Sequence, residues 1–155
     1  MEQVARVNGA ELSCAGRVVA RYRWGHELPR ELSPRPYLHP VTTLAGTPVT
    51  GFMPADHRHH LGASLAIPIV NGANFWGGRT YVRGEGSIPL DNHGTQRHTR
   101  WSCWLPDRLA HELSWEGPDG APVAREERSI SARPVDDGSW VLSFESALFG
   151  AGGPR

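Results

Sequence analysis

One stretch of sequence decides the fold: Leu109-Ala110-His111-Glu112-Leu113-Ser114-Trp115. Large side chains occupy the odd positions, and small or polar ones occupy the even positions. This alternation has the two-residue period of a β-strand that buries one face. The stretch therefore predicts a strand whose odd-numbered side chains lie in the core.

The same period recurs on both sides of this stretch. It is found in residues 140–148, which follow a turn at Asp136-Asp137-Gly138, and in residues 18–24. Residues 96–104 are one more strand candidate. Residues 123–133 follow the turn signal Pro118-Asp119-Gly120 and are extended but mostly polar. The pattern predicts an all-β fold, an antiparallel β-sandwich in which a meander of six to nine strands encloses the core.

Length and charge limit the range of functions. The 155 residues suit one domain, which we place at residues 1–155. Basic and acidic residues number 16 each, so we expect no nucleic acid and no membrane surface as partner. The first residues lack the pattern of a signal peptide, and the chain has no run of about 18 apolar residues. These features favour a cytoplasmic protein.

Histidines are densest in Asp56-His57-Arg58-His59-His60. In extended backbone His57 and His59 share one face. With a third imidazole from His93, or from His39 or His98, they could hold zinc, iron or manganese. The alternatives are a polar ligand site without metal, and a loop that the imidazoles order through hydrogen bonds to the backbone.

Two further segments add candidate residues. Asp91-Asn92-His93-Gly94 offers a carboxylate and an imidazole that could act as base and acid, or simply form a turn. Asn71-Gly72-Ala73-Asn74-Phe75-Trp76 combines a turn with aromatic residues, so Trp76 either stacks on a sugar ring or fills the core. The chain contains no Gly-x-Ser-x-Gly elbow and no phosphate-binding loop, which argues against a serine hydrolase and against nucleotide use.

Four ordered motifs carry a family resemblance. They are Arg35-Pro36-Tyr37-Leu38-His39-Pro40-Val41, Pro54-Ala55-Asp56-His57-Arg58-His59-His60-Leu61-Gly62, Val70-Asn71-Gly72-Ala73-Asn74-Phe75-Trp76-Gly77 and Leu90-Asp91-Asn92-His93-Gly94. Together they resemble the actinobacterial branch of the family labelled "methane oxygenase PmoA". The resemblance is strongest over residues 34–104 and extends to the remaining strands by pattern.

The resemblance implies a galactose-mutarotase-like supersandwich and a carbohydrate ligand. The family label names an oxygenase, but true particulate methane monooxygenase is an integral membrane complex, so we do not take the label as a function. Relatives of this kind continue through further strands, so this chain would be the N-terminal portion, truncated at the C-terminus. Such a cut would expose strand edges through which a homodimer could form. Ile69 stands where the family pattern leads us to expect an acidic residue.

Three functional hypotheses follow. The first is a carbohydrate-binding or carbohydrate-modifying protein. In it, His57 or His60 would be the acid and Asp56 or Asp91 the base or orienting group. The resemblance adds a set of ligand-binding positions: His39, Asn71, Asn74, Trp76 and His93. The second is a metal-dependent oxidoreductase or hydrolase that uses His57, His59 and His93. The third is a non-catalytic fragment or interaction module.

Overall fold

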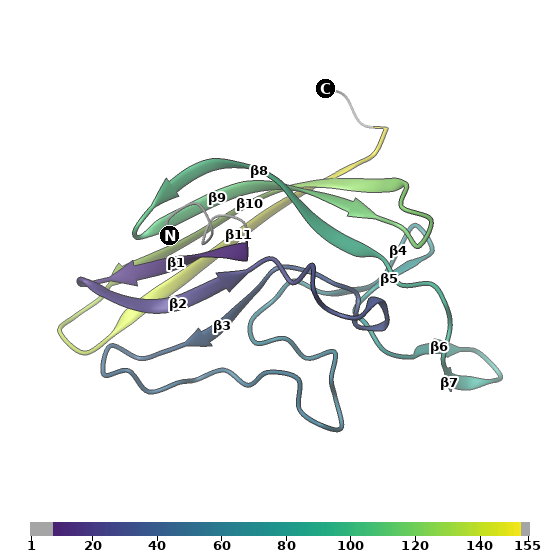
Figure 1. The fold of residues 1–155 in the computed structure, drawn as a ribbon, viewed down its shortest axis with the longest axis horizontal. Coiled ribbons are helices and arrows are strands. Elements are labelled where there is room, and N and C mark those ends of the chain that lie inside the picture. Colours follow the sequence, from purple (N-terminus) through teal and green to yellow (C-terminus); the bar gives the residue numbers. More distant parts are fainter. Residues whose placement is uncertain (1–7, 153–155) are drawn as a thin grey trace.

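The computed structural model describes residues 8–152, which form an all-β structure (Figure 1). A single 3-10 turn, η1 (Arg30–Leu32), interrupts the strands. The strands are β1 (Gly9–Cys14), β2 (Arg17–Arg23), β3 (Tyr37–Val41), β4 (Ile67–Val70), β5 (Ala73–Phe75), β6 (Thr80–Val82), β7 (Gly86–Ile88), β8 (Thr95–Leu105), β9 (Arg108–Glu116), β10 (Pro122–Pro134) and β11 (Trp140–Gly150).

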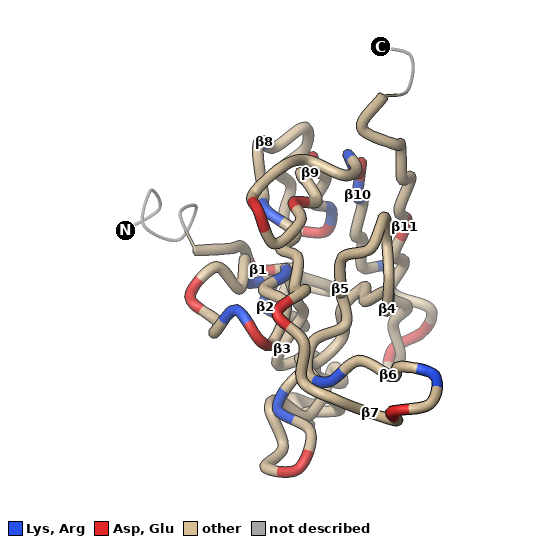
Figure 2. The backbone as a smooth tube through the Cα atoms, turned by 90° about the vertical axis from the view of Figure 1, so that its right-hand side faces the viewer, with Lys and Arg blue, Asp and Glu red and all other residues tan. Residues whose placement is uncertain are grey.

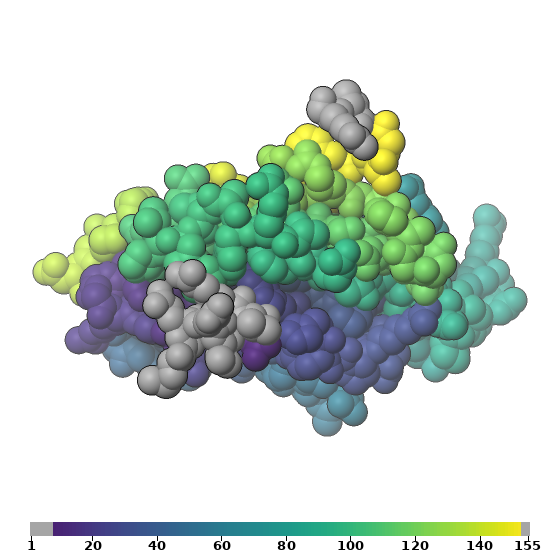
Figure 3. Space-filling view, turned by 45° about the horizontal axis from the view of Figure 1, so that its top comes forward, coloured from purple at the N-terminus to yellow at the C-terminus, as the bar shows by residue number. Residues whose placement is uncertain are grey.

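Two antiparallel sheets form the sandwich. One has the order β1-β2-β3 and the other the order β11-β10-β9-β8. In the space-filling view the green four-stranded layer covers the purple and blue three-stranded layer (Figure 3). The hairpins β4-β5 and β6-β7 are separate two-stranded sheets, and β6-β7 lies at the far end of the molecule (Figure 1). The predicted antiparallel β-sandwich is confirmed.

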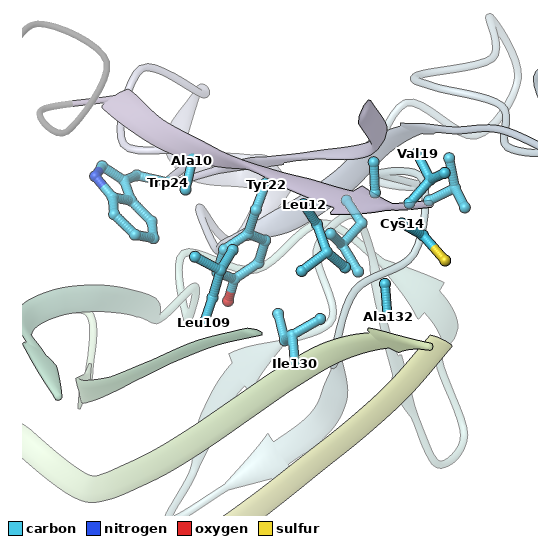
Figure 4. Close-up of a cluster of buried hydrophobic side chains, with 12 residues drawn as sticks. Ala10, Leu12, Cys14, Val19, Tyr22, Trp24, Leu109, Ile130 and Ala132 are labelled. Atoms are coloured by element: carbon cyan, nitrogen blue, oxygen red, sulfur yellow. The ribbon is translucent and has the colours of Figure 1, made fainter. Parts of the chain in front are cut away.

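The core fills the space between the two layers. Leu109, His111, Leu113 and Trp115 of β9 are all buried, so the odd face of this strand points inward, as its period predicts. Side chains of β1 and β2, Leu12 and Tyr22 among them, point toward Leu109 and Ile130 of the opposite sheet (Figure 4). A second cluster joins Phe75 of β5 to Leu113 and Trp115, and so fastens the β4-β5 hairpin to the sandwich.

The number of strands was underestimated. Residues 8–152 contain eleven strands, where six to nine were predicted. The strands without a predicted range are β1, β3 and β4 to β7, and the last four are three or four residues long and lie among prolines and glycines. A strand this short shows barely one full alternation, so periodicity does not reveal it.

Charged residues are unevenly spaced along the described chain, with none in residues 36–55 or 59–78. Basic and acidic positions are interspersed along the backbone, as the equal totals suggest (Figure 2). Within residues 8–152, no helix has the length and apolar character that crossing a membrane requires.

Candidate functional site

The histidine-rich segments meet at a pair of glycines, Gly77 and Gly78, between β5 and β6. The Gly78 amide donates to the Glu31 carbonyl at 2.7 Å, and the Gly78 carbonyl accepts from His93 Nε2 at 2.7 Å. His59 packs against both glycines, since a Cβ placed on Gly77 would lie 2.8 Å from the His59 Cβ. The backbone conformations of the pair, with φ of 99° and 67°, favour glycine. The turn at Gly77 and Gly78 therefore contacts both the His59 segment and the His93 segment.

The segment around His59 is an imidazole cluster on an exposed loop. Ring centroids of His57, His59 and His60 lie 4.7 to 6.0 Å apart. His57 Nδ1 is 3.0 Å from Asp56 Oδ2, and this hydrogen bond is the main reason why the pKa of Asp56 is lowered. Partial burial, followed by the neighbouring imidazoles, lowers the pKa of His59, which favours its neutral form.

Within residues 8–152, no three His, Cys, Asp or Glu side chains are grouped closely enough to hold a metal ion. His93, which was predicted as the third ligand, uses Nε2 to donate to the Gly78 carbonyl. His98, the alternative, bonds through Nδ1 to His111 in the core. The metal hypothesis therefore stays a prediction.

Asn74 shapes the turn that presents Trp76. Its side chain is buried, and its Oδ1 accepts from the backbone amides of Trp76 and Gly77 at 2.8 and 2.9 Å. Its own carbonyl accepts from the Ser33 hydroxyl at 2.6 Å. This asparagine therefore holds the backbone in place, and the turn it stabilises leaves the indole of Trp76 43% exposed.

Trp76 lies in an open pocket of about 290 Å³. Tyr81, which is 76% exposed, also lines this pocket, and Arg79 and Thr80 add polar groups. Ile69, which stands where the resemblance leads us to expect an acidic residue, is on the same wall. We call this space the Trp76 pocket. It combines aromatic surface with hydrogen-bonding side chains, as small-molecule sites commonly do.

A second pocket, of about 470 Å³, adjoins the first through Arg79, which lines both. Asp91 and His93 are part of its lining, and Asp91 Oδ1 lies 3.4 Å from Arg30 Nη2 at an exposed ion pair. The Arg79 guanidinium donates twice to the Ser87 carbonyl, at 3.2 and 2.7 Å, and this contact orients it. Four predicted site residues are thus brought to adjacent pockets: Asn74, Trp76, Asp91 and His93.

A family model covers residues 9–153 and describes a family of unknown function, DUF6807. The chain belongs to DUF6807. No curated protein and no solved structure matches it.

The other predicted residues of this DUF6807 chain lie apart from the two pockets. His39 hydrogen-bonds Thr50 Oγ1 at 2.8 Å and stacks on Phe52. Asn71 occupies the β4-β5 turn with φ of 48° and reaches the Val123 carbonyl at 3.5 Å. Asp56, His57 and His60 are not among the described residues that line either pocket.

Sequence reasoning missed a buried charged network in this chain. Arg128 binds Glu126 with two hydrogen bonds, Nε to Oε1 at 2.7 Å and Nη2 to Oε2 at 2.8 Å, and both side chains are fully buried. Trp115 and Ser146 also donate to the Glu126 carboxylate, each at 2.8 Å. Burial by itself lowers the pKa of Arg128, but Tyr22 and Glu126 outweigh it and the pKa is raised. The guanidinium is therefore charged in the core.

A signal for this network was present in β10. Its inward positions alternate as Ala124, Glu126, Arg128, Ile130 and Ala132. Two charged residues therefore interrupt an otherwise apolar face, and buried charges in proteins are paired. The period-two pattern of residues 123–133, followed position by position, would have placed Glu126 and Arg128 in the core.

Proposed function

We propose that this chain binds a carbohydrate in the Trp76 pocket. The observation that carries the proposal is the exposure of Trp76, an indole held open by a buried asparagine and accompanied by the exposed ring of Tyr81. A large aromatic side chain normally buries its surface, and one that is held in solvent beside polar groups is typical of an interaction site.

Sugar recognition suits this arrangement. The apolar face of a pyranose ring stacks on an aromatic side chain, while its hydroxyl groups need donors and acceptors around the rim. Thr80 and Arg79 supply such groups in the Trp76 pocket, and the pair Asp91 and Arg30 supplies them next to it. The resemblance to the PmoA-labelled family, which implies a carbohydrate ligand, supports the same class.

The proposal is limited to binding. Asp56, His57 and His60, the predicted acid and base residues, belong to the exposed loop and not to the lining of either pocket within the described chain. Asp91 is the predicted catalytic carboxylate that lines the pocket next to the Trp76 pocket.

Titration with a panel of mono- and disaccharides, followed by tryptophan fluorescence and calorimetry, tests the proposal. We expect saturable binding of at least one sugar, and we expect Trp76→Ala to weaken it at least about tenfold, or about 1.4 kcal/mol. Phe149→Ala is the matched control, because Phe149 is also an exposed aromatic residue but lies on β11. Unchanged affinity in a folded Trp76→Ala protein, or no binding by any sugar, would contradict the proposal.

A further inference from the structure

A third pocket, of about 530 Å³, lies at the edge strand β8, and none of its lining residues lines the Trp76 pocket. Gln96 and His98 of β8 form one wall, and Trp24 and Pro34 form another. The His98 ring stacks on the Trp24 indole with centroids 4.1 Å apart and planes within 6° of parallel. The imidazole is therefore held in one orientation at the pocket wall.

A hydrogen-bond chain runs from this imidazole into the core. His98 Nδ1 lies 2.8 Å from His111 Nδ1, and His111 Nε2 lies 2.9 Å from the Tyr22 hydroxyl. Arg128 Nη1 donates to the same hydroxyl at 2.8 Å. The Tyr22 hydroxyl points from β2 toward the four-stranded sheet (Figure 4). Its partners His111 and Arg128 belong to that sheet.

The arginine determines the direction of every link in this chain. A guanidinium only donates, so the Tyr22 oxygen accepts from Arg128 and its own hydrogen goes to His111 Nε2. His111 is neutral, because burial and then Arg128 lower its pKa to about 2. Its hydrogen therefore sits on Nδ1 and is donated to His98 Nδ1. His98, whose pKa burial also lowers, then carries its hydrogen on Nε2.

The opposite direction is disfavoured. If His111 Nε2 donated to Tyr22, the buried tyrosine hydrogen would have no acceptor among the contacts of the described residues, which costs about 1 to 3 kcal/mol. Among residues 8–152, Trp101 Nε1 is the only buried side-chain nitrogen or oxygen without a partner. His98 Nε2 makes no hydrogen bond to residues 8–152 and is not one of their buried unpaired atoms, so it is accessible in the pocket.

We infer that this pocket binds a small carboxylate, with the carboxylate oxygen accepting from His98 Nε2. The ionisable side chains that line it are His26, Arg97 and His98. Arg97 is bonded to the Glu116 carboxylate and His26 Nδ1 lies 3.9 Å from Glu27 Oε2, so the donor left for a ligand is His98 Nε2. A fixed N–H donor rejects a cation and forms its strongest hydrogen bond with an ionised acceptor such as a carboxylate oxygen. A volume of this size suits a metabolite-sized molecule.

Nuclear magnetic resonance of protein with ¹⁵N-labelled histidine tests the first part, the tautomers. We expect His111 with its hydrogen on Nδ1 and His98 with its hydrogen on Nε2. Tyr22→Phe removes the link to Arg128, so we expect His98 and His111 each to populate both neutral tautomers. A wild-type spectrum with the hydrogen of His98 on Nδ1 would overturn the inference, whether or not the Tyr22→Phe protein folds.

Titration with benzoate tests the second part, with benzamide as the uncharged comparison. We expect a saturable shift of the His98 Nε2 signal with benzoate, and binding of benzamide at least about tenfold weaker. His98→Phe keeps an aromatic ring against Trp24 but removes the donor, so it should abolish benzoate binding as followed by calorimetry. Trp76→Ala should leave it unchanged. No saturable response to benzoate, acetate or citrate, or full benzoate binding by His98→Phe, would overturn the inference.

Discussion

At the scale of single residues, the position of a polar side chain in a motif did not reveal its partner. Asn71 and Asn74 belong to the same predicted ligand-binding motif, yet one occupies a turn on the surface and the other is buried beneath Trp76. The Asn74 side chain satisfies two backbone amides, which would otherwise be left without acceptors. The main contribution of Asn74 is therefore to fix the backbone conformation of the site.

Replacement of Asn74 by alanine should destabilise the protein by about 2 to 4 kcal/mol, since two amides lose their acceptor. Urea unfolding followed by circular dichroism measures this change. Asn71→Gly is the control, because glycine accepts the φ of 48° at that turn, and we expect a change below about 0.5 kcal/mol. Equal losses in the two variants would show that Asn74 does not have this role.

At the scale of elements, short connections rather than long strands build the candidate site. The segment between β5 and β6 passes close to η1 and to the His59 loop, and a side chain on Gly77 would meet backbone there. A Cβ at this position would lie 2.7 Å from the Leu32 carbonyl oxygen. The close approach of these loops therefore depends on two properties of Gly77: it has no side chain, and it adopts a positive φ.

Comparison of Gly77→Ala with Gly72→Ala separates these two effects. Both residues have positive φ, 99° and 82°, so both variants carry backbone strain, but a Cβ on Gly72 meets nothing within 4 Å. We expect Gly77→Ala to lose about 1 to 3 kcal/mol more than Gly72→Ala, because of the additional overpacking. Thermal unfolding measures the difference, and similar stability of the two variants would contradict the close approach.

At the scale of the whole molecule, a charged network holds the two sheets together. Tyr22 of the three-stranded sheet contacts Arg128 and His111 of the four-stranded sheet. The network is buried and its polar groups are paired, so loss of one partner would leave a charge without compensation in the core. Protonation of His111 would add a positive charge near Arg128 in the core, so the stability should depend on whether His111 is protonated.

The pH dependence has a definite sign. The pKa of His111 is about 2 in the folded protein and near its usual 6.5 when unfolded, so the unfolded state binds the additional proton. The stability from this group is complete above pH 6.5 and falls as the pH is lowered, by about 2 kcal/mol at pH 5. Urea unfolding between pH 7.5 and pH 5 should show this loss, and His111→Gln should reduce it.

His26→Gln is the matched control for the pH experiment, because His26 is an exposed histidine outside the network. The stability of the His26→Gln variant should fall between pH 7.5 and pH 5 as that of the wild type does. If His111→Gln kept the full loss of stability between pH 7.5 and pH 5, the buried imidazole would not be its source.

Self-association through an open edge stays a prediction. β11 is at one end of the four-stranded sheet, and its apolar side chains Phe144, Leu148 and Phe149 are exposed in the monomer. An unpaired edge that carries such side chains is the kind of surface on which strands add to one another.

The sequence by itself determined the class of fold. Alternation in residues 109–115 correctly placed β9 and its buried face, and the turn signals before residues 123 and 140 correctly separated β9, β10 and β11. These features are local, because the pleat of a strand sends neighbouring side chains to opposite faces whatever the rest of the chain does. Trp76, Asp91 and His93, which the sequence offered as candidates, line the two adjoining pockets, and their role stays a prediction.

Only the tertiary structure decided what each polar residue contacts. Tyr22 and Arg128 are 106 positions apart in the chain, and no local pattern brings them together. His93 and His98, both candidate metal ligands, were separated because one bonds the glycine turn and the other bonds the core. Such partners depend on how the sheets pack, since hydrogen bonds form wherever folding brings a donor and an acceptor together, near or far in sequence.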